Sequence, residues 1–285
     1  MHDCYLLSGR CAYPGECRKY LTGCDSTCPT KNEYPSLAGN DIAGSWQYRR
    51  SLFCGEEGIP IATNSQWVLE QAKAALPSIN YAKVVYLGVD CTLYHPIERC
   101  LARQLLGLAE DDLIVLFGAV NIEDQRKGGR IFHEISEALK DRISFLVFGD
   151  NSQVYKSLNT TGGMVKDFRK MPLLYNAADV YLFLSLEEAF GQTVMEASAC
   201  GVPVIAFNIG GVGEVALNEK NAVLLDDLSA SAVIGVLDNM IEKRQSLESL
   251  GQTGIELVRN KFSLHAQGEN WSHYLTSLAE EKTIS

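Results

Sequence analysis

The sequence contains no long hydrophobic run, and positive charge is scarce. No stretch of about 18 consecutive apolar residues occurs, and the chain does not start with the charged and then apolar pattern of a signal peptide. We therefore expect a cytoplasmic protein without a transmembrane segment. The 25 Lys and Arg residues are outnumbered by 35 Asp and Glu residues, which gives a formal net charge of -10. Because nucleic-acid binding needs clustered positive charge, we expect no nucleic-acid partner.

Cysteine is plentiful, but its distribution argues against a disulfide framework. Five of the nine cysteines lie within the first 28 residues: Cys4, Cys11, Cys17, Cys24 and Cys28. An odd total without an export signal favours free thiols. The last four are spaced Cys-x5-Cys-x6-Cys-x3-Cys, which is wider than the paired spacing of most zinc sites. We therefore expect structural thiols and predict no metal site, although the sequence leaves metal binding by this cluster open.

The length and the pattern of apolar residues indicate two domains. At roughly 150 residues per domain, the 285 residues allow about two. We expect residues 1–50 to be irregular, and a strand followed by a helix is predicted over 61–76. From residue 112, apolar strands alternate with helices, the strands lying at 112–119, 143–149, 179–185 and 202–207. Such alternation is typical of a parallel sheet covered on both faces, so we predict an α/β protein with a doubly wound sheet.

The predicted domain limits follow from this pattern. We expect a first domain over 1–95, a sheet domain over 96–262, and a carboxy-terminal helix within 263–285 that crosses back to the first domain. In an open parallel sheet, ligands bind at the carboxyl ends of the strands. Functional residues are therefore expected in the loops that follow the predicted strands.

Two glutamates lie at one of these loops. Glu188 directly precedes a predicted helix N-terminus, and Glu196 lies inside that helix. The free amides of a first turn favour an anion or a hydroxyl-rich ligand, and carboxylates accept hydrogen bonds from hydroxyls. The pair therefore suits a sugar or a ribose. The alternative is that both glutamates only favour the helix dipole and solvation.

The loop after the first strand of the sheet carries two cations and two glycines. Arg126 and Lys127 precede Gly128 and Gly129 at a strand-to-helix crossover, which would suit a diphosphate. The alternative is a solvated Arg-Lys turn. A second turn, with Gly210 and Gly211, lacks the spacing of a dinucleotide-binding fingerprint.

Together these motifs resemble glycosyltransferase family four, whose members are retaining enzymes of GT-B fold. The resemblance is carried by the run 179–185, Glu188-Ala189-Phe190-Gly191, Glu196-Ala197, 200–204 and Gly210-Gly211-x-x-Glu214. The segment from His2 to Pro29 is similar to a subgroup that builds bacterial exopolysaccharide and capsule. GT-B type implies a complete Rossmann-like donor domain here, plus a partial amino-terminal Rossmann-like domain. We accordingly expect an amino-terminally truncated chain.

The resemblance also implies roles for single residues. Glu188 would contact the hydroxyls of the donor sugar, Glu196 the ribose, and Lys127 the diphosphate. The remaining candidates are His2 near the reacting centre, Arg126 in place of an arginine that the family has after the glycine of the first strand, the amides of Phe190 and Gly191, the turn at Gly210 and Gly211, and the backbone of Val165 toward the base.

The resulting prediction is a metal-independent glycosyltransferase that transfers sugar from a nucleotide diphosphate with retention. It needs no cofactor besides its donor, for which a UDP- or GDP-linked sugar is favoured, and its acceptor would be a glycan or lipid-linked molecule. Peripheral contact with the inner face of the membrane is compatible with this activity. The alternative is a catalytically inactive or truncated remnant that binds nucleotide sugars.

Overall fold

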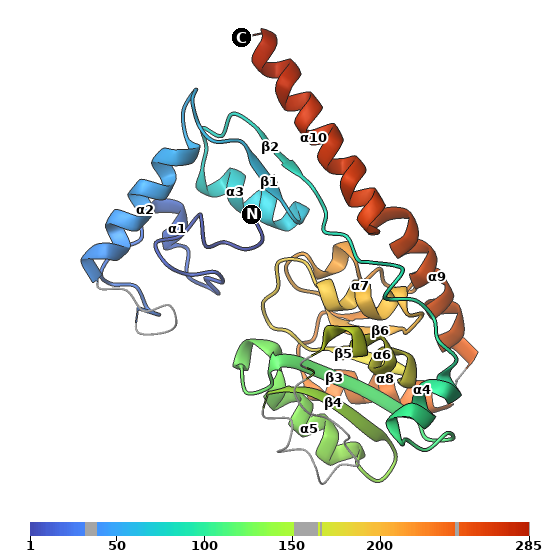
Figure 1. Ribbon diagram of the computed structural model, residues 1–285. Helices are drawn as coiled ribbons and strands as arrows, with labels where there is room; N and C mark the ends of the chain where they lie inside the picture. The colour runs from blue at the N-terminus through green and yellow to red at the C-terminus, as the bar shows by residue number, and fades with distance from the viewer. Residues whose placement is uncertain (32–38, 151–164, 166, 243–244, 285) are drawn as a thin grey trace. The chain divides into compact units, whose positions relative to one another are not determined.

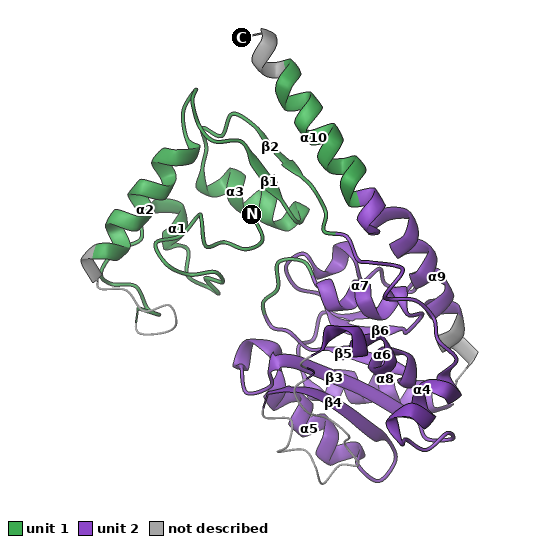
Figure 2. Ribbon diagram, viewed as in Figure 1, with its two compact units in different colours: residues 1–87, 187–190, 267–285 green, residues 88–186, 191–266 purple. Residues whose placement is uncertain are grey.

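The computed structural model describes residues 1–31, 39–150, 165, 167–242 and 245–284 (Figure 1). They form two compact units (Figure 2). Unit 1 comprises Met1–Leu87, Glu187–Phe190 and Gln267–Ser285, and unit 2 comprises Gly88–Leu186 and Gly191–Ala266. None of the described helices is long and apolar enough to cross a membrane.

Unit 1 is built around a short parallel sheet. Its elements are α1 (Lys19–Thr22), α2 (Gly39–Phe53), β1 (Ile61–Thr63), α3 (Gln66–Ala75) and β2 (Ala82–Val84). Strands β1 and β2 pair in parallel, with Ile61 opposite Ala82. Helix α3 begins where Ser65 caps it, since the Ser65 hydroxyl accepts a hydrogen bond of 3.1 Å from the amide of Val68. The strand and the helix predicted over 61–76 are thus confirmed.

Helix α2 corrects the expectation of an irregular segment up to residue 50. Its two glycines, Gly39 and Gly44, lower its helix propensity, so the sequence pattern alone did not reveal it. Tertiary contacts hold it in place. The indole of Trp46 donates a hydrogen bond of 2.9 Å to the carbonyl of Tyr20, and Ile42 is fully buried.

Unit 2 contains a five-stranded parallel sheet in the order β4-β3-β5-β6-β7. The strands are β3 (Ile114–Asn121), β4 (Ser144–Asp150), β5 (Val180–Phe183), β6 (Val204–Phe207) and β7 (Ala222–Leu225). Leu116 lies opposite Leu146 on one side and Tyr181 on the other. The predicted doubly wound sheet is confirmed, with β7 as an additional edge strand whose short apolar run was not recognised.

Helices cover both faces of this sheet. They are α4 (Arg99–Leu106), α5 (Gly129–Leu139), α6 (Met171–Ala177), α7 (Gln192–Ala199), α8 (Ala230–Glu242) and α9 (Gln245–Lys261), with 3-10 turns η1 (Gln125–Lys127), η3 (Phe168–Lys170) and η4 (Val212–Glu214). Helices α5 and α8 pack on one face, where the ring of Phe132 stacks on that of Phe117 at 4.2 Å. On the other face, Tyr181 of β5 contacts Tyr175 of α6 edge-on at 5.6 Å.

Helix α10 (Leu264–Ile284) begins in unit 2 and continues in unit 1. Within unit 1, Tyr274 packs edge-on against Tyr81 with ring centroids 5.2 Å apart. The division between the units falls after Leu87 and after Ala266, whereas the sequence placed the limits after residues 95 and 262.

Candidate functional site

The candidate site lies where the strand order of the unit 2 sheet reverses. Strand β3 has β4 on one side and β5 on the other, so the connections leaving β3 and β5 run in opposite directions from this point. A doubly wound sheet opens a crevice there, at the carboxyl ends of the strands. The segments of unit 2 that border it are residues 122–127 after β3 and 184–186 after β5. One backbone hydrogen bond of 2.7 Å joins them, from the amide of Leu186 to the carbonyl of Arg126.

A cavity of about 150 Å³ occupies this crevice. Its lining includes Gly118 and Ala119 of β3, Lys127 of η1, Ser185 after β5 and Thr193 of α7. The lining thus combines apolar strand residues with one cation and three hydroxyl-bearing residues, Tyr181, Ser185 and Thr193. An arrangement of this kind can hold a ligand that carries both negative charge and hydrogen-bonding groups.

Arg126 and Lys127 have different surroundings although they are neighbours in sequence. Asp124 caps η1, because its Oδ1 accepts a hydrogen bond of 2.9 Å from the amide of Arg126. The other carboxylate oxygen lies 3.4 Å from the Arg126 guanidinium. Lys127 lines the cavity, and Arg126 is not among the lining residues. The structure therefore brings Lys127 rather than the Arg126 side chain to the crevice.

The two glycines after Lys127 allow the loop to pack closely. A Cβ atom on Gly128 would lie 2.1 Å from the carbonyl oxygen of Leu184, and one on Gly129 would lie 2.0 Å from that of Ile122. Gly128 also has a φ of +75°, which disfavours residues with a side chain. The sequence had suggested that these glycines allow a diphosphate to approach. In the structure they let the loop after β3 pack against neighbouring backbone.

Replacing Gly128 by alanine is expected to lower the free energy of unfolding by about 2–4 kcal/mol, because strain at positive φ adds to the clash with Leu184. Urea unfolding measures the loss. Gly107→Ala is the matched control, since Gly107 has a φ of +68° and nothing within 4 Å of the added Cβ. It should cost only about 1 kcal/mol. Equal losses in the two variants would show that the Leu184 contact is unimportant.

Glu188 and Phe190 belong to unit 1. The hydroxyl of Tyr13 donates a hydrogen bond of 3.3 Å to Oε1 of Glu188, and the amide of Ala189 donates one of 3.2 Å to the same atom. The ring of Phe190 is buried and stacks on Tyr86, with centroids 5.6 Å apart. Glu188 thus presents a carboxylate that already accepts hydrogen bonds from a hydroxyl and an amide.

Gly191 and Glu196 belong to unit 2, at the start of α7 and inside it. Gly191 has a φ of 103°, which a glycine adopts readily. The hydroxyl of Tyr175 donates a hydrogen bond of 2.9 Å to Oε2 of Glu196. Burial raises the pKa of Glu196 to about 7, while the hydrogen bond from Tyr175 acts in the opposite direction. Glu196 is therefore a half-buried residue whose carboxyl changes charge near neutral pH.

This carboxyl gives a prediction about stability. The pKa of an unperturbed glutamate is 4.5 and that of Glu196 is about 7, so between these values the folded state keeps a proton that the unfolded state has lost. The free energy of unfolding should therefore decrease as pH rises from about 4.5 to about 7. In the Glu196→Gln variant this decrease should be smaller by up to about 3 kcal/mol.

Urea unfolding at several pH values between about 5 and 8 tests this prediction. Glu134→Gln is the control, because Glu134 is an exposed residue paired with Arg130 on the surface of α5. If the free energy of unfolding changes with pH in the same way in the wild type and in the Glu196→Gln variant, Glu196 does not titrate in this range.

The other predicted site residues are not among the residues that line the cavity. The His2 side chain is exposed in unit 1, and its backbone carbonyl accepts a hydrogen bond of 3.3 Å from Asn64. Gly210 and Gly211 form the turn before η4, and Gly210 has a φ of 51°. Val165 is half-buried, and its neighbour Met164 falls outside the described residues. Within unit 2, the structure brings Lys127 together with hydroxyls rather than with these residues.

Sequence reasoning missed two residues of this region. Thr193 lines the cavity, and its Oγ1 accepts a hydrogen bond of 3.0 Å from the hydroxyl of Tyr181. Tyr175 holds Glu196, from which it is 21 residues away. Thr193 lies one turn before Glu196 on α7, so helical spacing was a usable signal for it. No local sequence pattern predicts that Tyr175 contacts Glu196.

Sequence comparison finds related glycosyltransferases. Residues 130–257 match the family described as Glycosyl transferases group 1. The D-inositol 3-phosphate glycosyltransferase of Thermobifida fusca is 27% identical over 98% of this chain and 68% of its own length. The colanic acid biosynthesis glycosyl transferase WcaC of Escherichia coli is 25% identical over 90% of this chain and 65% of its own. For the D-inositol 3-phosphate glycosyltransferase of Rhodococcus jostii, the chain spans 47% of the relative's length.

Solved structures share the fold. Sucrose-phosphate synthase from Thermosynechococcus elongatus superposes with a TM-score of 0.70 at 22% identity, over 84% of this chain and 62% of that one. Anabaena Alr3699/HepE, in complex with UDP and glucose, superposes with a TM-score of 0.67 at 19% identity, over 82% of this chain and 67% of that one. The predicted α/β fold of GT-B type is confirmed.

Proposed function

We propose, because residues 130–257 match the family described as Glycosyl transferases group 1, that the chain transfers a sugar from a nucleotide diphosphate to a glycan or lipid-linked acceptor. The reaction retains anomeric configuration and needs no metal ion. The observation that carries this proposal is the cavity at the reversal of the strand order, which is lined by Lys127, Ser185 and Thr193.

The chemistry of the leaving group explains why a cation matters at this position. When the bond between sugar and diphosphate breaks, negative charge develops on the phosphate oxygens. A fixed ammonium group beside them stabilises that charge in a site from which water is largely excluded. Lys127 would provide this charge, and the amino-terminal ends of α5 and α7 would add partial positive charge.

The carboxylates would orient the donor rather than attack it. Ionised carboxylates only accept hydrogen bonds, so Glu188 suits the hydroxyls of the sugar and Glu196, in its deprotonated form, those of the ribose. The amides of Phe190 and Gly191, the turn at Gly210 and Gly211, His2 near the reacting centre and the backbone of Val165 complete the proposed donor site.

The donor is proposed to be a UDP- or GDP-linked sugar. HepE, which shares the fold, was solved with UDP and glucose and with UDP-glucose, and this supports the uridine nucleotide. For a lipid-linked acceptor, transfer would take place at the inner face of the membrane.

Isothermal titration calorimetry on the full chain tests the proposal with UDP, GDP, ADP and their glucose conjugates. We expect one nucleotide to bind clearly more tightly than the others. Transfer of radiolabelled sugar, together with donor hydrolysis, then separates an active enzyme from a remnant that only binds. Binding without turnover would favour the remnant, and the absence of any nucleotide binding would overturn the donor site.

A further inference from the structure

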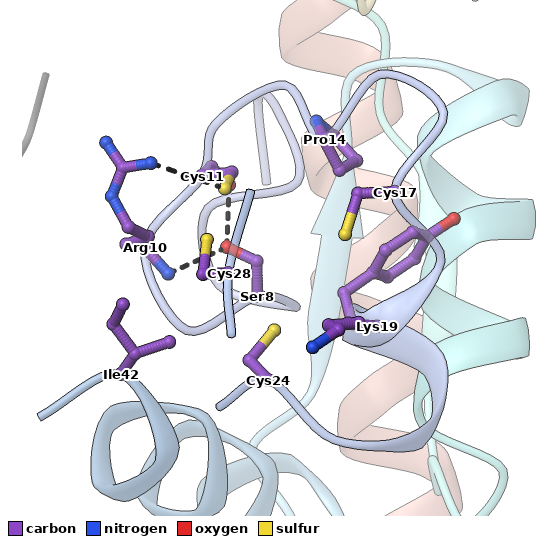
Figure 3. Close-up of a pocket in the computed structure, with 10 residues that line it drawn as sticks. Ser8, Arg10, Cys11, Pro14, Cys17, Lys19, Cys24, Cys28 and Ile42 are labelled. Atoms are coloured by element: carbon purple, nitrogen blue, oxygen red, sulfur yellow. Dashed lines mark hydrogen bonds between the residues drawn. The ribbon is translucent and has the colours of Figure 1, made fainter. Parts of the chain in front are cut away.

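Four cysteines line one small cavity in unit 1 (Figure 3). They are Cys11, Cys17, Cys24 and Cys28, called the thiol cluster below, and all four are free thiols. The cavity has a volume of about 10 Å³. This is room for about one water-sized sphere. Thiols are weak hydrogen-bonding groups, so they offer little to a water molecule but are strong donors to a soft cation.

The thiols are close enough to influence one another. Burial raises the pKa of Cys24, and the neighbouring Cys11, Cys17 and Cys28 raise it further. The Sγ atoms of Cys11 and Cys28 lie 3.4 Å and 3.6 Å from the same atom, Oγ1 of Thr30. Four cysteines therefore lie around one cavity, although they come from a stretch of 18 residues that contains only the four-residue helix α1.

A buried cation adjoins the cluster. Arg10 is 2% exposed, and its guanidinium donates a hydrogen bond of 2.8 Å to the Thr30 hydroxyl and lies 3.8 Å from Sγ of Cys11. Burial raises the pKa of Cys28, but hydrogen bonds from Thr30 and Arg10 outweigh it and leave that pKa lowered. Arg10 thus favours the thiolate form of Cys28, whereas burial raises the pKa of Cys11 and of Cys24.

We propose that Cys11, Cys17, Cys24 and Cys28 bind one zinc ion and that this ion fastens the amino-terminal segment of unit 1. Four thiolates around Zn²⁺ form a common structural site with tetrahedral geometry. The complex carries two negative charges, which the adjacent Arg10 partly balances. Binding releases the protons of those thiols that are protonated, and no redox change occurs.

The proposal requires the side chains to turn inward. In their present side-chain conformations, no three His, Cys, Asp or Glu residues of the described part of the chain are placed to bind one metal ion together. Rotation about the Cα–Cβ bond moves each sulfur between staggered positions without moving the backbone. The wide spacing in sequence is no obstacle, because the fold has already brought the four residues around one cavity.

Metal analysis of the full chain, purified without chelator, tests the proposal. Plasma emission spectroscopy should find about one zinc per chain in the wild type. The variants Cys24→Ser and Cys28→Ser should each lose most of it. The double variant Cys91→Ser and Cys100→Ser is the control, because neither residue lines the cavity, and it should keep its zinc.

A second measurement does not depend on how the variants fold. Wild-type chain, stripped with chelator under reducing conditions, is titrated with Co²⁺, and thiolate coordination should produce an intense near-ultraviolet charge-transfer absorption that Zn²⁺ then removes. Absence of zinc after purification together with no such absorption would overturn the proposal. A disulfide within the cluster of the freshly purified chain would also overturn it, in favour of an oxidised pair.

Discussion

The Lys127→Ala variant is expected to lose about 100- to 1,000-fold in kcat/KM for the nucleotide-sugar donor. Lys127 lines the cavity at the carboxyl ends of β3 and β5. If the diphosphate leaves from this cavity, removing the ammonium group takes away stabilisation of charge that grows as the bond breaks. The loss should therefore be larger in kcat than in the affinity for the donor.

Lys140→Ala is the matched control for this variant. Lys140 caps the far end of α5, where its ammonium group pairs with Glu137 at 2.9 Å on the exposed surface. It should retain wild-type kinetics and a wild-type unfolding curve. If kcat/KM of Lys127→Ala stays within about twofold of the wild-type value, the diphosphate does not bind in this cavity.

The Glu188→Ala variant should weaken binding of the nucleotide sugar by about 10- to 100-fold, which corresponds to hydrogen bonds made by a charged group. Binding of the free nucleoside diphosphate should change little, since Glu188 is assigned to the sugar. Isothermal titration calorimetry with both ligands measures the difference. The carboxylate already accepts a hydrogen bond from Tyr13, so the variant also leaves that hydroxyl without this acceptor.

Two further variants separate these effects. Tyr13→Phe keeps the carboxylate and removes only the Tyr13 hydroxyl, while Glu187→Ala removes the adjacent carboxylate of the same loop. Both should discriminate between nucleotide sugar and free nucleotide as the wild type does. The assignment of Glu188 to the sugar is wrong if Glu188→Ala lowers the affinity for nucleotide sugar and free nucleotide equally. It is also wrong if Glu187→Ala lowers the affinity for the nucleotide sugar as much as Glu188→Ala does.

The sheet could be predicted from sequence because its strands are buried on both faces. Continuous apolar runs such as 113–117 and 180–184 mark such strands directly, and the loops at their ends then follow from topology. Strand β7 and helix α2 were missed, since one is a four-residue run and the other contains glycines whose cost is compensated by tertiary contacts.

The fine structure of the site depends on contacts that sequence spacing does not encode. The hydrogen bond between Tyr175 and Glu196 joins two helices, and no local pattern specifies it. The same holds for Gly128, whose partner Leu184 follows a different strand. Adjacent residues can also diverge, as Arg126 turns to Asp124 while Lys127 lines the cavity.

The interlocked loops after β3 and β5 limit how this protein can be re-engineered. Gly128 fits beneath the carbonyl of Leu184, and the amide of Leu186 binds the carbonyl of Arg126. A loop grafted from a relative at one position alone would meet a backbone shaped for the original partner. Chimaeras that exchange both loops together should therefore fold more readily than chimaeras that exchange one loop alone. The two loops are best exchanged as one structural unit.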